Sequence, residues 1–237
     1  MSKTKIEWCD YTINPVKGLC PMTCSYCYAR RMYKRFKWNS EIRFDYDFLD
    51  WKPPTESKVF IGSTIELFGG WIKPDWMARI LAWCKQNYEC TFIFLTKQPQ
   101  NLIKWSPFPN NCWVGVSATN ESMLDSAFLW LLNTEARVKF ISFEPLLEHV
   151  RLEVADLILA PKINWLIIGQ QTPPSKKTEP KIEWIREIVE AANKAKIPVF
   201  LKDNLLELVN YDSPETDFAF NKEGYYRQEF PTEAQQK

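Results

Sequence analysis

Leu166-Ile167-Ile168, inside the run Trp165–Gly169, is the stretch that decides the fold class. All three side chains are apolar, and two are β-branched, which favours a strand. Because no polar residue alternates with them, the strand is expected to be buried on both faces. Val59-Phe60-Ile61 has the same character. Strands of this kind are typical of parallel sheets covered by helices.

Similar apolar runs recur along the chain and alternate with helix-like stretches. The predicted strands are Lys5–Trp8, Lys58–Ser63, Cys90–Thr96, Cys112–Ala118, Val138–Phe143, Trp165–Gly169 and Pro198–Lys202. The predicted helices are Tyr28–Phe36, Asp75–Gln86, Pro99–Ile103, Glu121–Asn133 and Ile182–Ala195, with Asp75 and Asn120 at cap positions. This alternation predicts an α/β fold of parallel strands, either a barrel or an open sheet.

Composition narrows the class of protein. The 237 residues are 46% hydrophobic, enough for a globular core, and the net charge of +1 gives no bulk electrostatic reason to expect nucleic acid. The odd number of cysteines, seven, and the absence of a signal-peptide pattern at the start favour a reducing, cytoplasmic setting. No apolar run approaches the ~18 residues of a membrane span, so we expect no membrane partner.

Polar residues stand where the predicted strands end. They are Thr64 to Glu66, Thr96 and Lys97, Ser117 to Asn120, Glu144 and Pro145, Gly169 to Gln171, and Lys202 to Asn204. Barrels and open sheets of parallel strands place their active sites at the carboxyl ends of the strands. With a single histidine, His149, and no Gly-rich phosphate loop, neither a His-dependent triad nor a nucleotide-phosphate site is expected.

The motif Cys20-Pro-Met-Thr-Cys24-Ser-Tyr-Cys27 carries the chemistry. Its Cys-x3-Cys-x2-Cys spacing gathers three soft thiolates on one loop, one fewer than a cubane iron–sulfur cluster takes in electron-transfer proteins. Such a cluster keeps one iron open for a ligand. A zinc site, for which Cys9 is the nearest extra thiol, and inert buried cysteines are the alternatives. The other cysteines, Cys84, Cys90 and Cys112, are expected in the core.

The three-cysteine motif followed by an aromatic residue resembles the radical S-adenosylmethionine (SAM) superfamily. From about residue 3 to residue 204 the chain is similar to a phage-associated, radical-SAM-like family of uncharacterised function, a three-cysteine phage protein family. The shared stretches are Lys5 to Trp8, Asn14 to Val16, Cys24 to Ala29, Leu95 to Lys97, Trp113 to Ser117, Phe143 to Leu147, Trp165 to Gly169 and Phe200 to Lys202.

Two departures from that family stand out. Family members usually have more residues between the first and second cysteines. They also carry a Gly-Glu-Ser-Gly-like segment after Gly169, where this chain has Gln170-Gln171-Thr172-Pro173. The second departure weakens any inheritance of a substrate that the missing carboxylate would bind.

The resemblance implies an incomplete parallel (β/α)6–7 TIM-like barrel over residues 1–210, followed by a polar tail, 211–237. It implies a [4Fe–4S] cluster on Cys20, Cys24 and Cys27, with SAM on the open iron. An electron from a donor such as flavodoxin or ferredoxin would cleave SAM to a 5′-deoxyadenosyl radical, which abstracts hydrogen from an unknown substrate, with a nucleic acid component as a candidate.

The resemblance also implies cofactor contacts for Tyr26, Ser63, Thr64, Glu66, Ser117, Asn120 and Glu144. Each has a plainer alternative. Glu66 is otherwise a solvated loop residue, and Asn120 an ordinary helix cap. Glu144, whose backbone is restricted by the proline that follows, could instead pair with Lys97 or Lys202.

One local basic cluster follows the cysteines. Its members are Arg30, Arg31, Lys34, Arg35 and Lys37, interleaved with aromatic residues up to Trp38. Such a pattern can hold nucleic acid through phosphates and stacking, or can simply be a solvated helix face. Arg30 alone is expected on the cluster side. A zinc- or cluster-stabilised nucleic-acid-binding protein without catalysis is therefore the alternative function.

Overall fold

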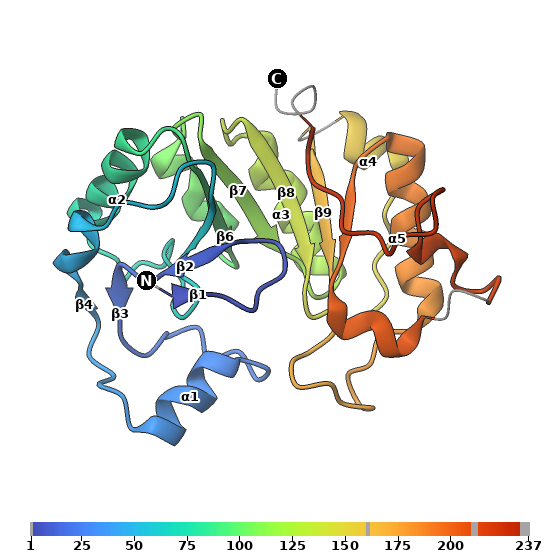
Figure 1. Cartoon of the computed structure of the whole chain (residues 1–237), viewed down its shortest axis with the longest axis horizontal. Coiled ribbons are helices and arrows are strands. Elements are labelled where there is room, and N and C mark those ends of the chain that lie inside the picture. The colour runs from blue at the N-terminus through green and yellow to red at the C-terminus, as the bar shows by residue number, and fades with distance from the viewer. Residues whose placement is uncertain (1, 160–161, 210–212, 233–237) are drawn as a thin grey trace. The chain divides into compact units, whose positions relative to one another are not determined.

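The computed structural model describes residues 2–159, 162–209 and 213–232. It divides into two compact units, which are described separately. Unit 1 runs to Val114 and includes residues 135–137, and unit 2 holds Gly115–Thr134 and the chain from Val138 onward. Figure 1 labels many of the helices and strands of both.

Unit 1 is built on parallel strands. Its sheet has the order β1-β2-β5-β6, formed by Ser2–Lys3, Tyr11–Ile13, Lys58–Ile61 and Thr91–Thr96. β1 is antiparallel to β2, and the other pairs are parallel. The start of β7 (Cys112–Ser117) follows beside β6, where the Phe92 N–H donates to the Asn111 carbonyl at 2.8 Å. A separate antiparallel pair joins β3 (Val16–Lys17) to β4 (Arg43–Phe44).

Helices connect these strands. They are α1 (Tyr28–Phe36), η1 (Tyr46–Asp50), α2 (Pro74–Gln86) and η2 (Pro99–Trp105), where η denotes a 3-10 helix. α2 packs by Trp83, whose ring lies 5.0 Å from that of Phe92 in β6. The helix begins at Pro74 after the N-cap residue Lys73, so Asp75 lies in the first turn rather than at the cap. A carboxylate there still complements the helix dipole.

The predicted strand Lys5–Trp8 is wrong. This stretch turns, and the Cys9 N–H donates to the Ile6 carbonyl at 3.3 Å. Trp8 is nevertheless buried, with its ring centroid 4.8 Å from that of Phe60. The strand place is taken by β2, three residues further on, because it is Tyr11 that pairs with Val59.

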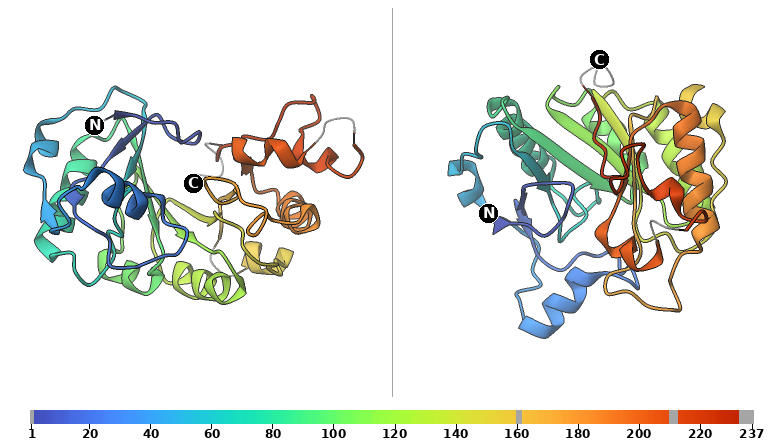
Figure 2. Two further views of the ribbon diagram at one scale, coloured as in Figure 1. Left: turned by 90° about the horizontal axis from the view of Figure 1, so that it is seen from below. Right: turned by 45° about the vertical axis from the view of Figure 1, so that its right-hand side comes forward.

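Unit 2 continues the pattern. After the end of β7 come β8 (Val138–Phe143), β9 (Trp165–Ile168) and β10 (Val199–Leu201), with β8–β9 and β9–β10 parallel. Its helices are α3 (Glu121–Leu132), α4 (Val154–Leu159), α5 (Ile182–Ala195), η3 (Asp203–Leu208) and η4 (Asp217–Ala219). α4, which the sequence did not predict, lies beside α5 (Figure 2).

The segment predicted to be a polar tail, 211–237, lies partly outside the described residues. In its described part, Gln228 forms an antiparallel bridge with Phe200 of β10. The Phe230 ring stacks on Trp165 at 5.4 Å, and Arg227 is buried. The predicted boundary at residue 210 stays a prediction.

The alternation of parallel strands with helices confirms the predicted fold class. The chain is an α/β protein with an incomplete TIM-like barrel of parallel strands, β2 and β5 to β10. Within each unit, the residues that follow the parallel strands lie at one edge of the sheet, the edge where the strands end. The polar residues predicted for the site follow these strands, so those of each unit lie at that edge. Across the described ranges, no helix is long and apolar enough to cross a membrane.

Candidate functional site around the cysteine loop

The loop Cys20–Cys27 lies in unit 1 and leads into α1. Its three cysteines are free and half-buried. Cys27 is the N-cap residue of α1, and its sulfur accepts a hydrogen bond from the Arg30 N–H at 3.4 Å. Arg30 also donates from its guanidinium to the Cys20 carbonyl, at 2.5 Å. Arg30 therefore faces the cysteine loop, as predicted, and holds the backbone of the loop by a hydrogen bond.

Cys20 is held from the neighbouring strand end as well. Its sulfur accepts a hydrogen bond from the Glu66 N–H at 3.5 Å. Burial raises the pKa of the Cys20 thiol, and the N–H of Glu66 only partly offsets that rise. Without a bound metal, Cys20 is thus a neutral thiol at physiological pH, and metal binding must displace its proton.

Glu66 is buried after β5, so it is not the solvated loop residue of the plainer alternative. Its Oε1 accepts hydrogen bonds from the Phe68 N–H at 3.0 Å and the Thr96 hydroxyl at 2.7 Å. Its Oε2 accepts from the Lys97 N–H at 2.8 Å. The carboxylate therefore joins the carboxyl end of β5 to that of β6.

Asn14 organises the residues just before Glu66. Its Oδ1 accepts hydrogen bonds from the Thr64 N–H at 3.1 Å and the Thr64 hydroxyl at 3.0 Å, and its amide donates to the Ser63 hydroxyl at 3.2 Å. The Tyr28 hydroxyl donates to the Ser63 carbonyl at 2.7 Å. Ser63 and Thr64 are thereby fixed between the end of β2 and the start of α1.

The end of β6 contacts the middle of the cysteine loop. Lys97 places its ammonium 5.9 Å from the ring centroid of Tyr26, a cation–π geometry. The next residue, Gln98, donates to the sulfur of Met22 at 2.9 Å. The ends of β5 and β6 thus contact the loop, and the end of β2 contacts the residues that follow β5.

The donor set suits a three-thiolate cluster, because three free thiols share one loop that receives N–H donors from outside. The sulfurs are not yet gathered. In the part of the chain that the structure describes, no three His, Cys, Asp or Glu side chains form a group that could hold a metal ion. The residues fit the cluster in chemistry, and the loop must close to bind it.

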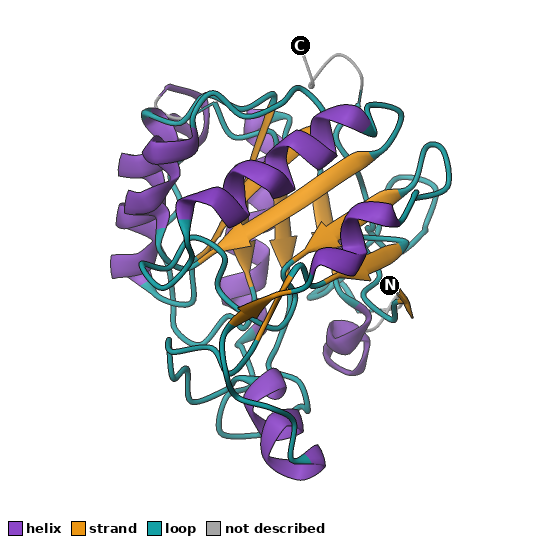
Figure 3. Cartoon of the chain, turned by 90° about the vertical axis from the view of Figure 1, so that its left-hand side faces the viewer, coloured by secondary structure: helices purple, strands orange, loops and turns teal. Residues whose placement is uncertain are grey.

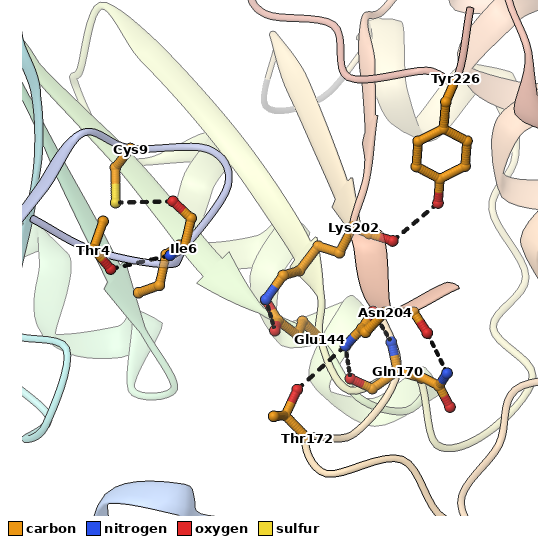
Figure 4. Close-up of polar contacts among 9 residues, drawn as sticks. All are labelled: Thr4, Ile6, Cys9, Glu144, Gln170, Thr172, Lys202, Asn204 and Tyr226. Carbon is orange, nitrogen blue, oxygen red and sulfur yellow. Dashed lines mark hydrogen bonds and ion pairs between the residues drawn. The ribbon is translucent and has the colours of Figure 1, made fainter. Parts of the chain in front are cut away.

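Unit 2 carries its own polar group at strand ends. Lys202, after β10, is buried and places its Nζ 2.5 Å from Oε1 of Glu144, after β8 (Figure 4). Gly169, after β9, leaves room for this pair, because a Cβ there would lie 2.9 Å from Cδ of Lys202 and 3.3 Å from Cγ of Glu144. Glu144 thus forms the ion pair with Lys202 that the sequence offered as the alternative to a cofactor contact.

Gln170 and Thr172, which depart from the family pattern, are hydrogen-bonded to Asn204. The Gln170 N–H donates to Oδ1 of Asn204 at 3.2 Å, and the Asn204 amide donates back to the Gln170 carbonyl at 2.7 Å and to the Thr172 hydroxyl at 3.3 Å (Figure 4). The Gln170 amide also donates to the Asn204 carbonyl. Gln170 is 1% exposed, so an amide here fixes the loop after β9 to η3.

Asn120 is the N-cap residue of α3, as predicted, and its Oδ1 accepts a hydrogen bond from the Met123 N–H at 3.0 Å. Ser117 ends β7 and is fully buried. The structure thus gives Asn120 a structural role. For both residues a cofactor contact stays a prediction.

The comparisons with known proteins cover most of the chain. A family model with the description "Protein of unknown function (DUF5131)" matches residues 3–205. No curated protein matches the sequence. A solved structure of a mutant spore photoproduct lyase, with bound AdoMet and dinucleoside spore photoproduct, is similar over 83% of this chain and 64% of its own, with a TM-score of 0.52 and 12% identity. At that identity the likeness shows the fold alone.

Proposed function

The chain belongs to the family described as protein of unknown function (DUF5131), and we propose that it is a radical SAM enzyme. The observation that carries the proposal is the cysteine loop at the carboxyl ends of parallel strands. Cys20 meets the N–H of Glu66 after β5, and Tyr26 meets Lys97 after β6. The fold shared with a protein that was solved with AdoMet supports it.

Cys20, Cys24 and Cys27 would hold a [4Fe–4S] cluster, which supplies the electron that cleaves SAM and starts hydrogen abstraction from a substrate. Hydrogen bonds to the sulfurs tune the potential of such a cluster. The N–H of Glu66 would have this role at Cys20, and that of Arg30 at Cys27. Tyr26 lies between the second and third cysteines and beside Lys97, where it would shield the cluster.

Ser63, Thr64 and Glu66 would contact the cofactor from unit 1. Asn14 holds the first two, so their polar atoms are already oriented. An ionised carboxylate has about four acceptor sites, and three protein donors leave Glu66 about one for an ammonium. Roles for Ser117, Asn120 and Glu144, and the likeness to a phage-associated family, stay predictions from the sequence.

Anaerobic reconstitution with iron and sulfide tests the proposal. We expect about four irons per chain, as a [4Fe–4S] cluster requires, and visible absorption from the iron–thiolate bonds. With dithionite, flavodoxin or ferredoxin as donor, SAM should give 5′-deoxyadenosine, measured by chromatography. C24S should lose both iron and product.

The buried Cys90 supplies the control, because its sulfur accepts a hydrogen bond from the Ser57 hydroxyl and its thiol donates to the Pro54 carbonyl. C90S should keep both iron and product. One zinc per chain with no iron would support the zinc-stabilised binding protein instead. A protein that holds a full cluster but never releases 5′-deoxyadenosine from SAM would carry the cluster without using it for catalysis, and the proposed enzyme activity would be wrong.

A further inference from the structure

The charge of the chain is unevenly distributed. Residues 28–40, which hold α1, contain five basic residues and no acidic one. The other 25 of the 30 basic residues are set against all 29 acidic ones. A chain with a net charge of +1 therefore carries a stretch of +5, of which Arg31, Lys34, Arg35 and Lys37 are exposed and Arg30 turns to the cysteine loop, while the remainder of the chain is net negative. An isolated patch of one sign is an electrostatic footprint for an anionic partner.

Aromatic rings stand beside these charges at the end of α1. Phe36 and Trp38 are 51% and 43% exposed, and their rings stack at 5.6 Å with an interplanar angle of 23°. Arg35 places its guanidinium 5.3 Å from the Phe36 centroid. Tyr33 is buried, and its ring packs edge-on against that of Trp38 with the centroids 5.2 Å apart. This contact holds the ring of Trp38 in place.

We propose that this surface, Lys34 to Trp38, binds single-stranded nucleic acid, with bases on the exposed rings and phosphates on the basic side chains. Proteins that bind single strands combine a basic track with aromatic rings on which bases stack. The helix dipole alone accounts for Lys34 and Arg35 in the last turn. It does not account for two large rings exposed beside them.

An anionic membrane is the other partner that a basic helix can suggest. A helix that binds a membrane leaves its apolar side free. In α1 the apolar residues Ala29 and Tyr33 face the protein and are buried, and the Tyr33 hydroxyl accepts a hydrogen bond from the Gly18 N–H at 2.8 Å. The exposed rings of Phe36 and Trp38 are stacked on each other beside the cations and do not form an apolar side of their own, which favours a nucleic acid.

The position of the surface connects it to the cysteine loop. α1 begins directly after Cys27 and projects from the strands of its unit (Figure 3). Its nine residues span about 14 Å at 1.5 Å per residue, the rise of about four nucleotides in a B-form strand. A strand docked along the whole length of α1 would span the distance from this surface to the loop. That link to the chemistry rests on the proposed function, whereas the docking does not.

Fluorescence anisotropy of the full chain with a labelled 12-nucleotide single strand, as DNA and as RNA, tests the docking. W38A should weaken binding about 5- to 150-fold, the effect of losing one stacked base, and W38F should retain it. The variant K34Q/R35Q/K37N should flatten the dependence of log K on log salt by about 2, at about 0.7 per phosphate. Asn is chosen at position 37 because the backbone there has φ 51°.

Matched controls come from exposed residues elsewhere in unit 1. K52Q/K85Q/K104Q removes the same charge, and Y88A removes a ring that is 75% exposed. Both should bind as the wild type does. Equal losses in these controls, no binding at low salt, or binding to phosphatidylserine vesicles without binding to the strand would overturn the proposal.

A variant with Cys20, Cys24 and Cys27 all changed to Ser separates the two hypotheses. It should bind the strand as tightly as the wild type. Strand binding in a protein that never releases 5′-deoxyadenosine would uphold the docking surface and refute the proposed enzyme. Release of 5′-deoxyadenosine without strand binding would do the reverse.

Discussion

Replacing Glu66 by glutamine separates two roles for this carboxylate, since glutamine keeps the size and removes the charge. Both carboxylate oxygens accept N–H donors, Oε1 from Phe68 and Oε2 from Lys97, and Oε1 also accepts the Thr96 hydroxyl. The amide of glutamine has only one acceptor oxygen. Whichever way it turns, an NH2 group must face one of the two backbone N–H groups.

The magnitude follows from those contacts. A hydrogen bond to a charged group contributes about 1.5–3 kcal/mol, and a buried N–H without an acceptor costs about 1–3 kcal/mol. Because these terms overlap, we expect E66Q to lower the free energy of unfolding by about 2–4 kcal/mol. T96V removes one donor and leaves the carboxylate two others, so it should cost about 1–2 kcal/mol.

Urea unfolding of the metal-free protein, followed by tryptophan fluorescence, measures these changes. E41Q, at an exposed glutamate, is the control and should stay within about 0.5 kcal/mol of the wild type. The reasoning is refuted if E66Q unfolds like the wild type. If it does so and the loaded protein loses SAM binding, Glu66 serves the cofactor and not the fold.

Three further predictions concern unit 2. G169A should cost about 1–3 kcal/mol, because its Cβ would meet Lys202 at 2.9 Å and Glu144 at 3.3 Å; thermal melting measures this, and an unchanged melting temperature would mean that the ion pair moves freely. N120A should cost about 0.5–2 kcal/mol in the same assay and N120D little, since aspartate keeps the cap; equal losses would contradict a capping role. Burial lowers the pKa of Lys139, so in the alkaline range the folded state binds fewer protons than the unfolded state. The free energy of unfolding should therefore rise as the pH climbs from that lowered pKa to the ordinary lysine value. Urea titrations measure this rise, and a K139M variant that shows the same rise would exclude Lys139 as its source.

Uniformly apolar runs made the parallel strands predictable. Val138–Phe143 is a strand with its predicted bounds, because a strand buried on both faces needs no alternation to be recognised. Lys5–Trp8 misled because Ile6 and Trp8 alternate with charged residues, as in a half-buried strand. Trp8 instead reaches Phe60 from a turn, a tertiary contact that local periodicity does not encode.

The candidate site was predictable in position and less so in contacts. Placement after strands identified Glu66, Glu144 and Lys202. That Glu144 and Lys202 pair depends on the spacing of β8 and β10 across β9, which the sequence does not give. A signal for the burial of Glu66 was available, because it stands between Ile65 and Leu67, and a glutamate in an apolar run is rarely solvated.

The contacts around the cysteine loop imply an order of assembly. Arg30 holds the Cys20 carbonyl, Gln98 holds Met22, and the N–H of Glu66 already points at a sulfur, while the three thiols are not yet gathered. The contacts of Arg30 with the Cys20 carbonyl and of Gln98 with Met22 do not involve the three thiols, so moving the thiols does not break them. Burial raises the pKa of the Cys20 thiol further, so cluster binding must release its proton as the three thiols are brought together. Loading should therefore be faster at alkaline pH and should protect this loop from proteolysis, whereas R30Q, which removes the grip on Cys20, should slow loading without changing the ligands.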